Sequence, residues 1–201
     1  MSRGSSMPAP LTFAANNYVD LTPGAGEVIT GMVAWGQRLF VFKQSKFFVF
    51  YGTSTDSAGS PVFNYNPVTS GRGLFTSGAV TKNTDGVYFM DHDGVYRTTG
   101  GAPEMISTNI EPFFLGGALD SYTGGQLNVS QIGLCRMAAY NDLIMLAYPT
   151  ESSSTNNRIL VYNTIDRNWT VYSIAASSLT AWRITALDEL VFSYAAGTKD
   201  V

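Results

Sequence analysis

Two tight turns in succession are encoded by the stretch VTKNTDGVYFMDHDGVYR, residues 80–97. Apolar and aromatic residues lie on either side of Asp85-Gly86 and of Asp93-Gly94. An Asp-Gly pair between two such runs is the strongest short-range signal for a β-hairpin, because both central residues of the favoured turn need a positive φ. The stretch therefore predicts two consecutive hairpins.

The same hairpin pattern recurs along the chain at intervals of about fifty residues. A strand, a short turn rich in Gly, Asn or Asp, and an aromatic or β-branched strand occupy residues 33–42, 80–90, 137–146 and 184–193. A recurrence of this length, with several strands in each unit, is typical of β-propeller blades. We therefore predict an all-β fold, a β-propeller-like array of about four antiparallel meander blades.

The predicted blades span residues 17–52, 62–100, 131–172 and 178–201. Together they form one domain over residues 17–201, and residues 1–16, small and polar, are expected to form a flexible leader. The Gly- and Ser-rich segment 52–61 is predicted to link the first two blades. The pattern asks for one more strand where the sequence stops at Val201, so we expect the last blade to be incomplete.

Residues 106–114 have the features of a short helix. Ser107 or Thr108 is placed to cap a single turn, with Glu111 nearby. Pro112 limits this helix to about one turn, because proline cannot continue the hydrogen-bond ladder.

Composition and charge exclude several classes of protein. Charged residues make up 13% of the 201 positions and aromatic residues another 13%. Such sparse charge suits a chain that buries surface against neighbours, because interface cores are poor in charge and rich in aromatic residues. The net charge of -3 provides no basic stripe to grip nucleic acid. No apolar run is long enough to span a bilayer, and the first residues lack the apolar stretch of a signal peptide.

Candidate metal-binding and nucleophilic residues are few. Cys135 is the single cysteine, which excludes an intrachain disulfide and a multi-cysteine zinc site, and we predict a buried core thiol. Asp91, His92 and Asp93 place two carboxylates and the only histidine together, a set that could bind a metal or transfer protons. They straddle a predicted turn, however, and turn chemistry explains both aspartates without a ligand.

A pair of carboxylates could also serve glycoside hydrolysis, which propellers are known to host. The aspartates available for such a pair are Asp56, Asp85, Asp91, Asp120, Asp142 and Asp188. Most of them fall at predicted tight turns, where backbone geometry accounts for them.

The remaining candidates each have a simpler structural explanation. Arg72, between two glycines, could face a ligand or a channel, but a solvated loop position is the simpler interpretation. A sugar-binding aromatic shelf could use Trp35, Trp169 or Trp182, yet all three sit where a packed core is expected. We therefore assign no catalytic, cofactor-binding or metal-binding residue and expect no enzymatic activity.

Two segments of the sequence resemble structural virion proteins of tailed bacteriophages. The first runs from residues 17–20 through residues 27–43 and contains ITGMVAW and LFVFK. The second combines GVYFMDHDGVYR, residues 86–97, with PEMIS at residues 103–107 and IEP at residues 110–112. The proteins that these segments resemble are propeller-like tail hub, nozzle and packaged-DNA stabilisation proteins, which are usually longer than this chain.

This resemblance implies a structural role in the virion tail. The resemblance is close over residues 17–115. In the remainder it rests only on the recurrence of the hairpin pattern. Proteins of this kind continue the tail tube beneath the portal, so the chain would form a homo-oligomeric ring of about six copies. DNA would pass through the ring as non-specific cargo, and the neighbours would be other tail or portal-proximal proteins. The resemblance implies a location in the virion tail after synthesis in the host cytoplasm. From the residues themselves we expect no membrane insertion and no cofactor.

Two other functions stay open at the level of sequence. A receptor- or glycan-binding propeller module would use exposed Trp or Tyr residues. A propeller glycoside hydrolase would depend on carboxylates such as Asp91 or Asp142.

Overall fold

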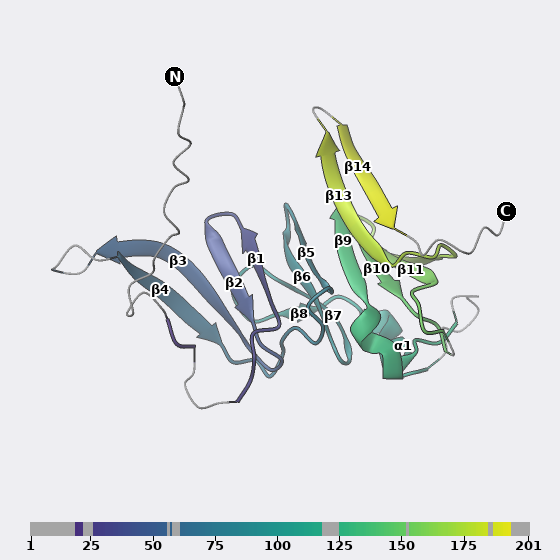
Figure 1. The fold of residues 1–201 in the computed structure, drawn as a ribbon, viewed down its shortest axis with the longest axis horizontal. Helices are drawn as coiled ribbons and strands as arrows, with labels where there is room; N and C mark the ends of the chain where they lie inside the picture. Colours follow the sequence, from purple (N-terminus) through teal and green to yellow (C-terminus); the bar gives the residue numbers. More distant parts are fainter. Residues whose placement is uncertain are drawn as a thin grey trace, which may run out of the picture.

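The computed structural model describes residues 19–21, 26–55, 57, 61–117, 125–151, 153–184 and 187–193. Within these residues the chain forms three four-stranded antiparallel sheets and a two-stranded hairpin, which follow one another along the sequence (Figure 1). Each sheet is a meander, because every strand pairs with the strand that precedes it in the chain. The predicted all-β class is confirmed.

The first sheet has the strand order β1-β2-β3-β4. Its strands are β1 (Gly31–Trp35), β2 (Arg38–Phe42), β3 (Phe47–Thr55) and β4 (Pro61–Val68). From the sequence, residues 62–68 are expected in the second blade and residues 52–61 are expected to form a linker. Instead, β4 pairs with β3 along its whole length, across one bulge. The physical reason is a cross-strand aromatic pair: Tyr65 lies opposite Phe50, and their ring centroids are 5.2 Å apart.

The second sheet contains both hairpins predicted from residues 80–97. Its strands, in order, are β5 (Val80–Asn83), β6 (Gly86–Asp91), β7 (Gly94–Thr98) and β8 (Glu104–Met105). The turn residues are 84–85 and 92–93, and none of them has the positive φ that the sequence analysis expected. Gly86 begins β6 at φ 155, where a Cβ would lie 2.8 Å from the Thr98 carbonyl oxygen. Glycine is therefore required beside the neighbouring strand rather than inside the turn.

The third sheet follows a 3-10 helix, η2 (Val129–Leu134), and has the order β12-β11-β10-β9. Its strands are β9 (Arg136–Tyr140), β10 (Leu143–Tyr148), β11 (Arg158–Asn163) and β12 (Asn168–Tyr172). The final hairpin pairs β13 (Ser178–Ile184) with β14 (Leu187–Ser193). The predicted leader, residues 1–16, and the end of the predicted last blade, residues 194–201, lie outside the described residues.

The short helix forms next to the second sheet as η1 (Thr108–Ile110) and α1 (Glu111–Phe114). Neither Ser107 nor Thr108 caps it through its side chain, so that part of the prediction is wrong. Ser107 is fully buried, and its hydroxyl instead accepts a hydrogen bond from the Val95 backbone N–H at 2.9 Å. Among the helices described, none is long and apolar enough to cross a membrane.

The first strands of successive sheets lie next to one another. β1 lies beside β5, β5 beside β9 and β9 beside β13, and the sheets extend outward from this row (Figure 1). The Met137 backbone N–H donates to the Gly78 carbonyl at 2.8 Å, which links β9 to the start of the second sheet. The Trp35 indole N–H donates to the Asn83 carbonyl at 2.7 Å, which links the first sheet to the second.

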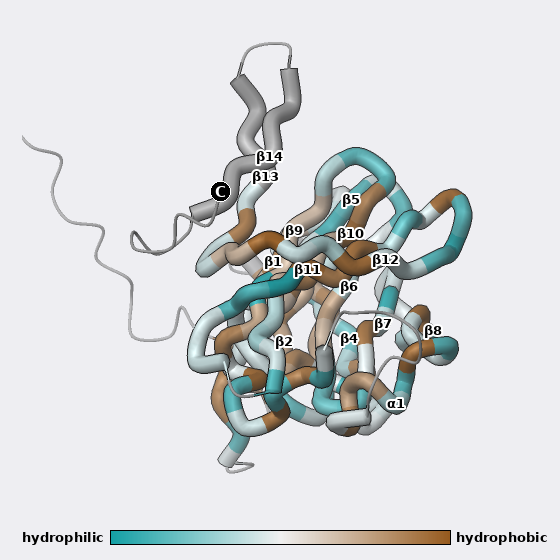
Figure 2. Tube along the Cα trace, turned by 90° about the vertical axis from the view of Figure 1, so that its right-hand side faces the viewer, coloured by the Kyte–Doolittle hydropathy of each residue, from teal (hydrophilic) through white to brown (hydrophobic). Residues whose placement is uncertain are grey.

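Apolar side chains fill the space between neighbouring sheets. Between the first two sheets, the ring of Phe89 lies 5.0 Å from that of Phe42 and 5.8 Å from that of Phe47. Tyr88, the adjacent residue on β6, belongs to the cluster between the second and third sheets. Because side chains alternate across a strand, both faces of the second sheet are buried. Figure 2 shows apolar stretches along β9 and β10 in the interior and polar stretches on outlying loops.

Candidate functional site

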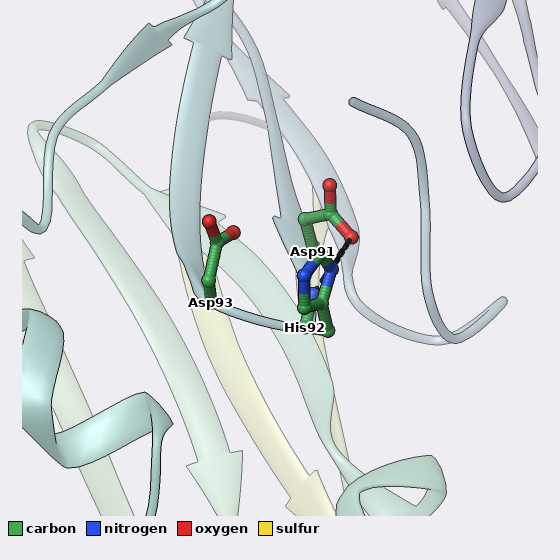
Figure 3. Close-up of side chains that lie close together, drawn as sticks. All are labelled: Asp91, His92 and Asp93. Carbon is green, nitrogen blue, oxygen red and sulfur yellow. Dashed lines mark hydrogen bonds and ion pairs between the residues drawn. The ribbon is translucent and has the colours of Figure 1, made fainter. Parts of the chain in front are cut away.

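The acidic cluster formed by Asp91, His92 and Asp93 lies at the turn between β6 and β7 (Figure 3). The candidate ligand atoms of these residues lie within 4.8 Å of one another. The buried Asp91 carboxylate accepts a hydrogen bond from the His92 backbone N–H at 2.7 Å, and its Oδ1 lies 2.8 Å from His92 Nδ1. Figure 3 shows this pair joined, with the Asp93 carboxylate standing apart from it.

Arg72 is the cation that this cluster binds. Its guanidinium forms an ion pair with Asp93, and its Nη1 lies 3.9 Å from Asp91 Oδ2. The same guanidinium lies 5.2 Å from the centroid of the Tyr96 ring, whose hydroxyl donates to Asp93 Oδ1 at 3.1 Å. Burial and the neighbouring Asp93 carboxylate raise the pKa of Tyr96, so its hydroxyl stays protonated and able to donate.

Arg72, Asp91, Asp93 and Tyr96 form what we call the arginine clasp. It holds the segment before β5 against the β6–β7 hairpin, and the Gly73 backbone N–H reinforces it at 3.4 Å from Asp91 Oδ2. The sequence analysis favoured a solvated Arg72, whereas the structure pairs it with two carboxylates. A metal or acid/base role gains no support from this geometry, because each carboxylate already has protein partners.

The other aspartates considered for glycoside hydrolysis lie either in turns between strands or outside the described residues. Asp85 lies in the β5–β6 turn and Asp142 in the β9–β10 turn, as the sequence predicts, and the two belong to different sheets. Asp56 and Asp120 lie outside the described residues, as does the side chain of Asp188. Turn geometry therefore accounts for Asp85 and Asp142 without a catalytic role.

The described tryptophans connect sheets. Trp35 joins the first sheet to the second, and the Trp169 indole N–H on β12 donates to the Ile106 carbonyl after β8 at 3.3 Å. The side chain of Trp182 lies outside the described residues. Cys135 is fully buried, as predicted, and burial raises the pKa of its thiol to about 12. Trp35 and Trp169 therefore link neighbouring parts of the fold through their indole N–H groups.

A polar cleft of about 460 Å³ opens between the second and third sheets. Tyr88, Arg97 and Glu104 line it from the second sheet, and Tyr162 and Arg167 line it from the third. Asp85 is the member of this lining that was considered from sequence for catalysis, and Thr108, considered there as a helix cap, lines the cleft as well. The sequence does not reveal the cleft, because its lining is brought together from two separate sheets. A charged residue, Arg167, in the turn between two strands is the one local feature of the sequence that could have pointed to this cleft.

The electrostatic groups of this cleft are held in place by the fold. Arg97 donates through Nη2 and Nε to the Asp85 carbonyl, at 2.9 and 3.3 Å, and its Nη1 lies 3.7 Å from Glu104 Oε2. Burial raises the pKa of Tyr88 and of Tyr162, although nearby arginine charges oppose the shift. Both phenols are therefore protonated at neutral pH and can donate hydrogen bonds.

The outer face of the first sheet, which points away from the second sheet, carries exposed apolar side chains. Met32 is 62% exposed and Phe63 is 51% exposed, and Leu39 is exposed on the same face. Leu21 packs against Phe48 and covers part of this face. Exposed apolar side chains therefore gather on this face of the first sheet.

Comparison of the chain with protein-family models and with curated proteins finds no match.

Proposed function

We propose that the chain is a structural virion protein of a tailed bacteriophage, a component of the tail hub, nozzle or head-to-tail conduit through which DNA passes. In this proposal the sheets are consecutive blades of a propeller-like domain. Radial repetition of four-stranded antiparallel blades around a centre is the defining feature of propellers. The row formed by β1, β5, β9 and β13 supports this interpretation, because the first strand of each sheet adjoins the next.

The observation that carries the proposal is the structural role of residues 86–112, the second segment that resembles the phage proteins. A Cβ on Gly94 would lie 2.5 Å from Ser107 Oγ, the atom that accepts the Val95 N–H. Arg97 donates a hydrogen bond to the Asp85 carbonyl in the β5–β6 turn, and Pro112 lies in the first turn of α1. The residues that carry the resemblance are thus those that shape the second sheet and the turn after it, which favours a shared fold over a chance match.

The surface chemistry supports a subunit with neighbours. The chain is poor in charge, and the outer face of its first sheet exposes Met32 and Phe63. In a ring of copies, faces of this composition are covered by adjacent subunits. The net charge of -3 favours a lumen that lets a polyanion slide, since many phosphate contacts from Lys and Arg would retain it. In this role the chain needs no cofactor and performs no reaction.

Solution mass by light scattering, together with negative-stain electron microscopy, tests this proposal. We expect rings of about six or twelve copies with a central hole. Met32→Lys should disrupt the rings if the outer face lies between subunits, whereas Leu115→Lys, at a site 63% exposed elsewhere, should leave them intact. A chain that stays monomeric at high concentration would contradict self-assembly into a ring.

A further inference from the structure

We propose that the polar cleft between the second and third sheets is a binding site for a neutral saccharide. The proposal goes beyond the structural role argued above and does not depend on it. The cleft has a volume of about 460 Å³, which lies within the range of small-molecule sites and leaves room for a disaccharide.

The charges that line the cleft balance one another. Arg97 and Arg167 are positive, and Asp85 and Glu104 are negative, so a charged ligand gains little from the net field. An apolar ligand would leave these groups without partners, which is unfavourable. Saccharide hydroxyls both donate and accept hydrogen bonds, and they match a lining that contains guanidinium and phenol donors together with carboxylate acceptors.

Tyr162 provides a second, independent indication. The residue is only 7% exposed, and its ring packs on Trp169 with centroids 4.8 Å apart. Its hydroxyl has no hydrogen-bond partner within the described part of the chain, although the residue lines the cleft. The phenol oxygen is not among the buried side-chain atoms that lack a partner, so it reaches the open cleft and is available to a ligand.

Arg167 occupies a position where glycine would be easier to accommodate. Its φ is 53, in the left-handed region that non-glycine residues rarely adopt. Its backbone N–H closes the turn by donating to the Asn163 carbonyl at 2.8 Å, a bond that does not involve the side chain. Glycine could therefore replace Arg167 and keep the turn, and the substitution separates the role of the guanidinium from that of the backbone.

Saturation-transfer NMR tests the proposal on the full chain. The probes are neutral disaccharides of glucose, galactose, N-acetylglucosamine and rhamnose, with inorganic phosphate as the anion control. We expect at least one disaccharide to receive saturation and to change tryptophan fluorescence, because Trp169 packs on Tyr162 and bonds to Ile106 at the cleft. Phosphate should not compete.

Two variants locate the binding site. Arg167→Gly should weaken disaccharide binding about tenfold, the loss expected for a hydrogen bond to a charged group. Its Tm should be unchanged or higher by about 2–4 °C, since the strained backbone is relieved. Tyr162→Phe, which keeps the ring on Trp169, should weaken binding about threefold.

Matched controls lie outside the cleft. Asn141→Gly replaces another left-handed residue, at φ 51, and Tyr172→Phe removes a phenol on the same strand as Trp169 that is 45% exposed. Both should bind the disaccharide like the unaltered chain. The proposal is overturned if no disaccharide in the panel binds, if phosphate binds in its place, or if Arg167→Gly and Tyr162→Phe bind normally. Each of these results leaves ring assembly, which rests on other surfaces, unaffected.

Discussion

Replacement of Phe89 by alanine tests whether aromatic packing holds the first two sheets together. Phe89 is fully buried on β6, and its ring lies 5.0 Å from Phe42, 5.8 Å from Phe47 and 5.8 Å from Tyr96. Phe42 and Phe47 belong to the first sheet, and Tyr96 belongs to the second. The ring of Phe89 is therefore a point at which the two sheets meet.

The expected loss follows from burial. Truncation of a fully buried phenylalanine to alanine costs about 3–5 kcal/mol, because apolar contacts are lost and a cavity remains. The Phe89 site should fall in the middle of that range, about 4 kcal/mol, because rings from both sheets surround it and their strands limit collapse. Since a domain is stable by about 5–15 kcal/mol, this loss is a large fraction of the total.

Guanidinium denaturation, followed by circular dichroism and tryptophan fluorescence, measures the loss. Trp35 reports on the same interface, because its indole N–H bonds to Asn83 in the second sheet. Phe63→Ala removes an aromatic ring that is 51% exposed on the outer face, and should cost less than about 1 kcal/mol. Equal losses in the Phe89 and Phe63 variants, or a loss below about 1 kcal/mol for Phe89→Ala, would refute the reasoning.

The other predictions concern the arginine clasp and two buried groups. Arg72→Ala leaves Asp91 and Asp93 without their cation, so the free energy of unfolding should fall by about 2 kcal/mol; an unchanged urea midpoint would argue against the clasp. Burial raises the pKa of Cys135 to about 12, so a thiol reagent should label the chain only after denaturation, and labelling of the folded chain would contradict this burial. Burial raises the pKa of Tyr148 to about 12, above about 10 in the unfolded chain. The unfolded state loses this proton first, so Tm should fall as pH rises from about 10 to about 12; a constant Tm across this window would count against it.

Local turn chemistry in the sequence locates the hairpins, but it does not decide which strands share a sheet. The polar segment 52–61 suggested a linker between the first two blades. The pairing of β4 with β3 depends instead on the contact between Tyr65 and Phe50, which only the register brings together. Strand order therefore needs information about side-chain packing across strands.

The candidate sites show the same limit. The acidic cluster is visible in three consecutive residues, but its partner Arg72 meets it only when the segment before β5 folds onto the hairpin. The polar cleft forms where Arg97 and Tyr162 approach from different sheets. Neither juxtaposition leaves a pattern in the order of residues, because the fold of a loop onto a hairpin creates the first and the stacking of two sheets creates the second.

The most direct test of the virion assignment is the location of the chain in phage particles released from cells that carry its gene. Antibodies raised against the purified chain and coupled to gold can be applied to intact and to disrupted particles in the electron microscope. The account predicts label on the tail, at or below its junction with the head. Particles that carry no label in either state would contradict a structural role in the virion.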